Sequence, residues 1–190
     1  CGNMGTELPE PGVCVAKPSA GTENMYFGAC VKNELTDKVG NYLEEKFAAG
    51  GLLPHFYEDV RPKVWRKATS NSGFNTVCAV LRLKIKEVYD DPEGVELVWS
   101  VWKEASDVAA AMGIDGIWEY MHEEMPRIVK GLGDYYPSMA QDAQAHRQTE
   151  VDSLTGAISM FGRKVGVPTP TCDVLTREIK AIQANYERQY

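Results

Sequence analysis

The sequence predicts a mainly α protein: a helical bundle of about six helices preceded by a short β segment. Apolar residues recur at helical spacing from Thr36 onward, whereas strict alternation is confined to a short stretch at Val13 and Val15. One face of a helix repeats about every 3.6 residues and one face of a strand every two. Two helix starts are also marked, because Asp91 and Thr169 each precede a proline, which suits the first turn of a helix.

Length and composition indicate a globular chain without a nucleic-acid or membrane partner. The 190 residues are 44% hydrophobic, which is enough for a core. Twenty-seven acidic residues against 20 basic ones give a net charge of −7, and no basic cluster offsets it, which disfavours nucleic acids and anionic membranes. No apolar run reaches the roughly 20 residues that span a bilayer, and no secretory leader pattern is present. The expected localisation is therefore cytoplasmic.

The cysteines predict neither a disulfide framework nor a metal site. They are odd in number, widely spaced and without a Cys-x-x-Cys pair, so we interpret them as buried or free thiols: Cys1, Cys14, Cys30, Cys78 and Cys172. The segment that begins at His122 lacks the second histidine, four residues further on, that a helical zinc site needs. It is expected at the surface, and no metal is predicted.

The first part of the chain predicts short strands and one helix. After the alternating segment, a second strand is expected within residues 24–31. A helix is expected from Thr36 and should end at Gly50-Gly51, since glycine commonly closes a helix. Residues 52–57 should then be extended, and 58–62 should cross into a second domain. The inward face of this helix is expected to carry Val39, Leu43 and Phe47.

Six helices are expected in the rest of the chain. They should span residues 59–81, 91–112 and 115–130, and then begin near Ser138, Glu150 and Thr169, with a loop over 131–136 before Ser138. A kink or interruption is expected at Pro126. We interpret Trp99 and Trp102 as core residues, because aromatic residues at this spacing belong to an inward helix face. The other inward positions are Val95, Val98, Ala105, Ala109, Met112, Leu154, Ile158, Phe161, Val165, Leu175, Ile179, Ile182 and Tyr186, with Arg177, Lys180 and Arg188 outside.

One stretch of the first of these helices carries a spaced polar set. Lys67, Asn71 and Asn75 fall at i, i+4 and i+8, and each step of four advances about 40° around a helix, so the three share a stripe about 80° wide. A solvated face is the plain alternative. Asparagine is a poor helix former, however, and the small residues Ser72 and Gly73 indicate close packing nearby. We therefore interpret the stripe as a candidate binding surface.

Two further polar residues allow both a structural and a functional interpretation. Ser138 with Gln141 three residues later has the form of a capping box, although a residue at a helix start can also face a bound anion. Glu150 begins a helix or lies early in one, where an acid is favourable in the first turn. The residues alone leave both alternatives open.

Two groups of motifs resemble the C-terminal domain of ketopantoate reductases (2-dehydropantoate 2-reductases). The first is Trp65-Arg66-Lys67 followed by Asn71 and Asn75. The second comprises residues 137–142 (Pro-Ser-Met-Ala-Gln-Asp), 147–152 (Arg-Gln-Thr-Glu-Val-Asp) and 166–170 (Gly-Val-Pro-Thr-Pro). The resemblance covers about residues 60 to 185. Thr76 departs from the proline that the family often has there, beside the matching positions.

The resemblance implies the helical domain shared with 6-phosphogluconate dehydrogenases. It implies an NADPH-dependent reductase that converts the 2-oxo acid ketopantoate to pantoate, on the route to pantothenate and coenzyme A. Lys67 and Glu150 would then be catalytic, and Asn71, Asn75 and Ser138 would bind substrate. In such an enzyme the cation of Lys67 stabilises the ketone oxygen as it becomes an alkoxide.

The resemblance also implies a domain division. Residues 1–58 are expected to be the tail of a nucleotide-binding α/β domain, and 59–190 the helical substrate domain. No Gly-x-Gly-x-x-Gly turn between a strand and a helix occurs, so most of the NADPH site is expected outside this chain, which would then be an inactive fragment. The alternatives are reduction of another 2-oxo acid, or a helical binding or dimerisation module without catalysis. A homodimer is compatible with each of these.

Overall fold

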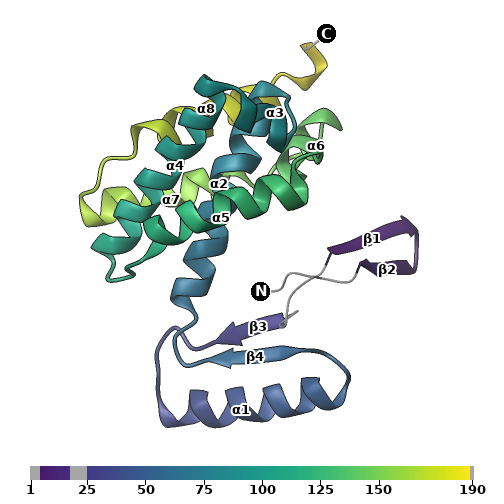
Figure 1. Cartoon of the computed structure of the whole chain (residues 1–190), viewed down its shortest axis with the longest axis vertical. Helices are drawn as coiled ribbons and strands as arrows, with labels where there is room; N and C mark the ends of the chain where they lie inside the picture. Colours follow the sequence, from purple (N-terminus) through teal and green to yellow (C-terminus); the bar gives the residue numbers. More distant parts are fainter. Residues whose placement is uncertain (1–4, 18–24, 189–190) are drawn as a thin grey trace. The chain divides into compact units, whose positions relative to one another are not determined.

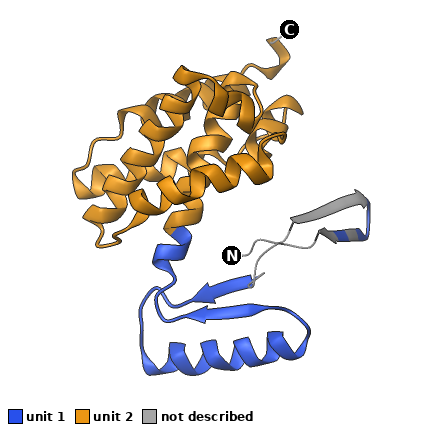
Figure 2. Ribbon diagram, in the orientation of Figure 1, with its two compact units in different colours: residues 1–64 blue, residues 65–190 orange. Residues whose placement is uncertain are grey.

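The computed structural model describes residues 5–17 and 25–188. The chain divides into two compact units, Cys1–Val64 and Trp65–Tyr190, which Figure 2 distinguishes by colour. The expected mainly α composition is confirmed, since the described residues form eight α-helices and four short strands. Figure 1 labels these helices and strands.

The first unit contains two separate strand pairs. β1 (Gly5–Glu10) and β2 (Val13–Lys17) form an antiparallel hairpin, with a register shift between Glu7 and Glu10. β3 (Met25–Gly28) and β4 (Pro54–Tyr57) are parallel, and α1 (Glu34–Ala49) makes the crossover between them. A parallel pair needs such a crossover because the chain must return to the same end of the sheet. The strands expected within 24–31 and 52–57 are confirmed by β3 and β4.

Helix α1 has well-defined ends. It begins two residues before the expected Thr36, because Asn33 is its N-cap and forms a capping box with Thr36. It ends before Gly50, as expected. Its buried position is Gly40, against which the Phe56 ring packs so closely that a Cβ there would lie 2.2 Å from Cε2. The expected inward residue Val39 is instead 46% exposed.

Seven helices lie in the remainder of the chain, one more than expected. They are α2 (Arg61–Leu81), α3 (Ile85–Asp90), α4 (Pro92–Ala111), α5 (Ile117–Leu132), α6 (Ser138–Gln144), α7 (Thr155–Val165) and α8 (Pro170–Gln183). Two 3₁₀ turns, η1 (Val151–Ser153) and η2 (Tyr186–Arg188), accompany them. The additional helix is α3, whose six residues are too few to show a helical period in the sequence.

The two helices that begin with a proline, α4 and α8, are capped by different groups. Asp91 is the N-cap of α4 and its carboxylate accepts a hydrogen bond from Gly94 N at 2.6 Å, as expected. Thr169 occupies the N-cap position of α8 without a side-chain cap. The Glu104 carboxylate of α4 instead accepts hydrogen bonds from the backbone N–H groups of Thr171 and Cys172, at 2.7 and 2.9 Å. The first backbone N–H groups of α8 thus find their hydrogen-bond acceptor on another helix, α4.

Two expectations about helix ends are wrong. Helix α5 continues through Pro126 to Leu132 without an interruption, so it extends into the segment expected to be a loop. Tyr186 does not continue the inward face of α8, because α8 ends at Gln183 and Tyr186 lies in η2. Its hydroxyl donates to Arg147 O at 2.9 Å, which gives this half-buried tyrosine a polar partner.

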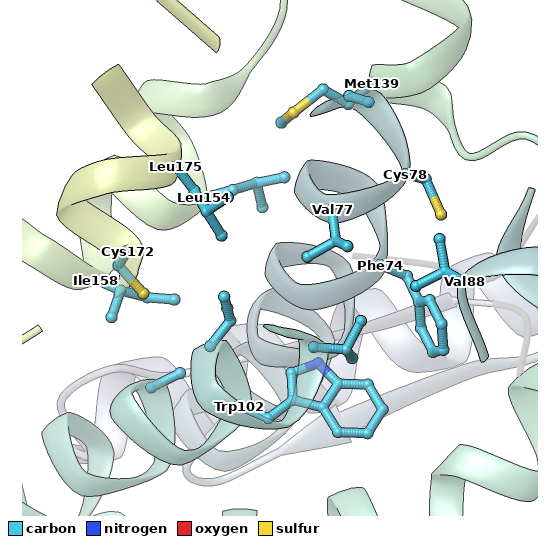
Figure 3. Close-up of a cluster of buried hydrophobic side chains, with 14 of the residues drawn as sticks. Phe74, Val77, Cys78, Val88, Trp102, Met139, Leu154, Ile158, Cys172 and Leu175 are labelled. Carbon is cyan, nitrogen blue, oxygen red and sulfur yellow. The ribbon is translucent and has the colours of Figure 1, made fainter. Parts of the chain in front are cut away.

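Buried apolar side chains from several helices form one core in the second unit. Figure 3 shows Val77 of α2 among side chains from α4, α6, α7 and α8. Trp102 is fully buried at the contact of α4 with α2, as expected, whereas Trp99 is half-buried. The Trp102 indole lies against Gly73, where a Cβ would stand 2.3 Å from Nε1. The close packing indicated by small residues beside the polar stripe is therefore real, and its partner is a tryptophan.

The described thiols are free, and two of them are shielded. Cys78 and Cys172 are buried, and Cys30 is exposed. Burial raises the pKa of the Cys78 thiol to about 12 and raises the pKa of the Cys172 thiol as well. Cys1 and the side chain of Cys14 lie outside the described residues. Across the helices that the structure describes, none combines the length and the apolarity that crossing a bilayer would require.

Candidate functional site

The predicted polar stripe lies on α2 and passes from a partly open end into the interior. Lys67 and Asn71 are half-buried, and Asn75 is only 7% exposed. At a rise of about 1.5 Å per residue, the eight steps from Lys67 to Asn75 extend roughly 12 Å along the helix. The stripe is therefore not a freely solvated face, and its asparagine at the buried end requires a hydrogen-bonding partner.

That partner is Ser138, the first residue of α6. Asn75 Nδ2 donates a hydrogen bond to Ser138 Oγ at 3.3 Å, although 63 positions separate the two residues in sequence. Because the serine oxygen accepts this bond, its own O–H remains able to donate to another group. Ser138 is exposed, so a ligand oxygen could reach that hydroxyl. The contact joins two residues to which the family resemblance gave a role in substrate binding.

The capping box proposed for Ser138 is wrong. Pro137 occupies the N-cap position, and its carbonyl accepts a hydrogen bond from Gln141 N at 3.0 Å. Ser138 is thereby already inside the helix, where its side chain makes no capping bond. The Gln141 side chain donates instead to Tyr136 O at 2.7 Å. The Ser138 hydroxyl thus contacts Asn75 and does not cap the N-terminus of its own helix.

Glu150 lies on a third segment, immediately before η1. Its carbonyl accepts a hydrogen bond from Ser153 N at 2.9 Å, so it opens a 3₁₀ turn, while α7 starts only at Thr155. The side chain is exposed. The neighbouring Thr149 is buried and its N–H donates to the Gln183 side chain of α8 at 2.6 Å, which anchors the segment. That Glu150 acts on the same ligand as the α2 stripe stays a prediction.

The residues that precede Lys67 fix the start of the stripe. The Trp65 ring lies 6.0 Å from that of Phe161 on α7. The Arg66 guanidinium lies over the Tyr120 ring of α5, 4.6 Å from its centroid, which is a favourable cation–π distance. Tyr120 could not be predicted as a partner, because no sequence spacing reveals which ring on another helix will meet Arg66.

The described residues contain no cluster suited to a metal ion. No group of three or more histidine, cysteine or acidic side chains with metal-binding geometry occurs among them. His122 is exposed as expected, and its Nδ1 lies 2.9 Å from Trp118 O. Its ring also packs 4.6 Å from that of Trp99, so it forms part of an aromatic cluster. The chemistry available at the stripe and at Ser138 is therefore that of an ammonium group, two amides and a hydroxyl.

Comparison with known proteins identifies the family of the helical unit. The family described as ketopantoate reductase PanE/ApbA C terminal matches residues 59–183. A 2-dehydropantoate 2-reductase of Streptococcus pyogenes serotype M3 is 32% identical over 152 residues, which are 77% of this chain and 48% of that protein. The chain thus spans about half the length of the curated relatives that it matches.

Solved structures resemble the chain beyond the helical unit. D-mandelate dehydrogenase, in a ternary structure with NADH and anilino(oxo)acetate, is 28% identical with a TM-score of 0.77; the match covers 87% of this chain and 68% of that one. A PanE/ApbA family ketopantoate reductase from Ralstonia eutropha JMP134 has a TM-score of 0.81 at 21% identity, covering 99% of this chain and 59% of that one. The second likeness concerns the fold alone.

Proposed function

Because the chain belongs to the ketopantoate reductase family and contains its C-terminal domain, we propose that it forms the substrate-binding part of a nicotinamide-dependent 2-oxo acid reductase. Reduction of ketopantoate to pantoate is the first candidate reaction. The observation that carries the proposal is the contact between Asn75 and Ser138, since it joins the two motif groups of the family in one hydrogen bond. On this proposal residues 59–190 are the substrate domain, and residues 1–58 end a nucleotide-binding domain.

We assign the chemistry to the open end of the stripe. Hydride addition to a ketone leaves negative charge on oxygen, and the Lys67 ammonium would stabilise that charge and supply a proton. Asn71 and Asn75 would hold the substrate hydroxyl and carboxylate, assisted by the hydroxyl of Ser138. The Glu150 carboxylate would accept a hydrogen bond from the substrate and fix its orientation. Each role needs only the donor or acceptor that the side chain provides.

The turn from the parallel strand β3 into α1 lacks the glycines of a nicotinamide cofactor site. The turn between β3 and α1 reads Gly28 to Asn33 and contains no second or third glycine, so it is not a pyrophosphate-binding turn. We therefore propose that most of the NADPH site lies outside the 190 residues and that this chain alone is inactive. Calorimetric titration of the chain with NADPH tests this, because a micromolar dissociation constant would contradict it.

A different 2-oxo acid and a different nicotinamide are the second candidate. The motivating observation is the 28% identity to a D-mandelate dehydrogenase that binds NADH. The reductase that includes this chain would be assayed with ketopantoate and with benzoylformate, each with NADPH and with NADH. A higher kcat/KM for ketopantoate with NADPH supports the first candidate, and the reverse supports the second. Turnover of neither acid would contradict the first candidate and would exclude benzoylformate as the different 2-oxo acid.

A helical module that only mediates dimerisation is the remaining rival. An interface has no need of Lys67, Asn71, Ser138 and Glu150 together, which is why we place the enzyme first. The mass from light scattering tests whether the chain forms the possible homodimer. If it dimerises and Lys67→Ala in the complete reductase leaves turnover unchanged, the module becomes the better account. A cytoplasmic location stays a prediction that cell fractionation can check.

A further inference from the structure

Two helices of the second unit end in a conformation that normally requires glycine. Arg82, which follows α2, has φ of 58°, and His146, which follows α6, has φ of 54°. They are the two non-glycine residues with positive φ in the part of the chain that the structure describes. This conformation is unfavourable by about 1–2 kcal/mol for a residue with a Cβ. Glycine would end either helix at less cost in stability.

The hydrogen bonds show that both ends are of the same kind. Leu83 N donates to Cys78 O at 3.2 Å after α2, and Arg147 N donates to Asp142 O at 2.8 Å after α6. These bonds back across five residues are those of a Schellman motif, in which Arg82 and His146 take the position usually held by glycine. The two backbone turns therefore impose the positive φ, and any residue with a Cβ at these positions is strained.

The two strained residues line one cavity. Its volume is about 290 Å³, and α2, α6 and α8 bound it. These helices carry labels in Figure 1. Arg82, His146 and Gln144 supply its polar lining, while Ala79, Ala140 and Ile182 are among its apolar residues. None of the five candidate substrate-site residues lines it. The cavity is thus a separate place where a permanent cation, an imidazole and an amide border an apolar surface.

The imidazole of His146, which forms one wall of the cavity, is held in place by the ring of Tyr186. The His146 ring stacks on that of Tyr186, with centroids 4.9 Å apart and planes 6° from parallel. The Tyr186 hydroxyl donates to Arg147 O, and the Arg147 guanidinium pairs with Asp142 at 2.7 Å. A wall fixed in this way loses little conformational freedom when a ligand binds.

We propose that this cavity binds a small organic acid, with its carboxylate on Arg82 and His146 and its short apolar body against the alanines. Arginine stays charged at all ordinary pH values and matches a carboxylate with two parallel donors. The volume is at the lower limit of pockets that take drug-sized ligands, about 300–1,000 Å³, so the ligand is smaller than these. Inorganic phosphate fits less well, because it would leave the apolar lining without a partner.

The proposal is tested on the 190-residue chain with 2-methylpropanoate as the probe. For six non-hydrogen atoms a dissociation constant of about 1–10 mM is expected, measured by NMR titration. The neutral 2-methylpropanamide has the same shape and should bind at least about tenfold more weakly, since a charge-assisted hydrogen bond contributes about 1.5–3 kcal/mol. Inorganic phosphate serves as the third probe and should bind more weakly than the acid.

Matched variants locate the binding. Arg82→Gly and Arg82→Gln should each weaken binding of the acid at least about tenfold. Arg82→Gly should not lower the melting temperature, because glycine suits the positive φ. Arg127→Gln removes an exposed arginine that does not line the cavity and should bind like the wild type. Lys67→Ala separates this site from the α2 stripe and should also bind like the wild type.

Four outcomes would overturn the proposal. They are no saturable shift up to about 50 mM acid, equal binding of acid and amide, tighter binding of phosphate, and loss of binding in Lys67→Ala with retention in both Arg82 variants. The last result would place the acid on the α2 stripe, and it would leave the proposed reductase function unaffected.

Discussion

Asn75 and Ser138 meet through one hydrogen bond of 3.3 Å, which connects the buried end of the α2 stripe to the first turn of α6. Asn75 is almost completely buried, and Ser138 is exposed. The hydrogen bond therefore connects a buried amide to a hydroxyl at the surface. Its two members come from different motif groups in the sequence, so their contact depends on the tertiary fold.

Replacing Ser138 by alanine should lower the free energy of unfolding by about 1 kcal/mol. The change removes the Ser138 hydroxyl that accepts a hydrogen bond from the buried Asn75 Nδ2. An unsatisfied buried donor is destabilising by about 1–3 kcal/mol, and the effect is smaller here because Ser138 adjoins solvent. Urea unfolding measures the change. Ser153→Ala in η1, at an exposed position, is the control and should be nearly neutral. Equal stability of the two variants would show that the contact contributes nothing.

Replacing Gly73 by alanine should destabilise the second unit by about 1–3 kcal/mol, despite the better helix propensity of alanine. The added Cβ would lie 2.3 Å from Trp102 Nε1 and 3.0 Å from Val98 Cγ1, so α2 and α4 must separate. Thermal and urea unfolding would both report the loss.

Gly131→Ala provides the matched control for Gly73→Ala. Gly131 also lies in a helix, α5, but a Cβ there meets no atom within 4 Å. This variant should be more stable than the wild type by up to about 1 kcal/mol, because alanine loses less backbone entropy than glycine. If both glycine variants gained stability, the contact of Trp102 with α2 would be looser than described.

The starts of α4 and α8 were predictable, and the tertiary partners were not. Asp91 caps α4 through its own side chain, so the local signal was sufficient. At α8 the position was equally clear, but the capping group is Glu104 from another helix, which no local pattern specifies. The same limit explains Ser138: Pro137 takes the N-cap position, and the serine turns to Asn75.

The candidate site also has a part that was predictable from the sequence and a part that was not. The common face of Lys67, Asn71 and Asn75 follows from helix periodicity alone. The resemblance to a known family linked these residues to Ser138 before the structure brought Asn75 and Ser138 together. The cavity beside Arg82 and His146 gave no sequence signal, because an arginine or histidine after a helix does not reveal its backbone angle.

Stability should fall as pH rises from about 9 to about 12, in part because of Cys78. The unfolded thiol ionises near its ordinary pKa of 9, whereas burial raises the pKa of the folded thiol to about 12. Between these values the unfolded state binds fewer protons, so alkali favours unfolding; below pH 9 the contribution is fully present. Urea unfolding at pH 8 to 11 measures the slope.

Two cysteine variants isolate this effect. Cys78→Ala is less stable at every pH because it opens a cavity, but its stability should fall less steeply above pH 9. Cys30→Ser removes an exposed thiol and should keep the wild-type slope. Tyrosine titration is common to all three proteins and cancels in the comparison. Equal slopes for Cys78→Ala and the wild type would contradict the assignment of the effect to Cys78.

The last prediction concerns Lys67 in the proposed complete reductase, where turnover can be measured. A positioned ammonium stabilises the developing alkoxide far more than the neutral ketone, so its loss should appear mainly in kcat. Lys67→Ala should lower kcat by about 10²–10⁴-fold, or roughly 3–5 kcal/mol, with a smaller effect on KM. Lys67→Arg should not restore the rate fully, because a guanidinium keeps the charge but does not release a proton near neutral pH. Lys103→Ala, an exposed lysine of α4 paired with Asp107, is the control and should keep wild-type kinetics. Melting temperatures distinguish lost chemistry from lost folding, and a kcat within about threefold of the wild type in a folded Lys67→Ala protein would remove Lys67 from the catalytic role.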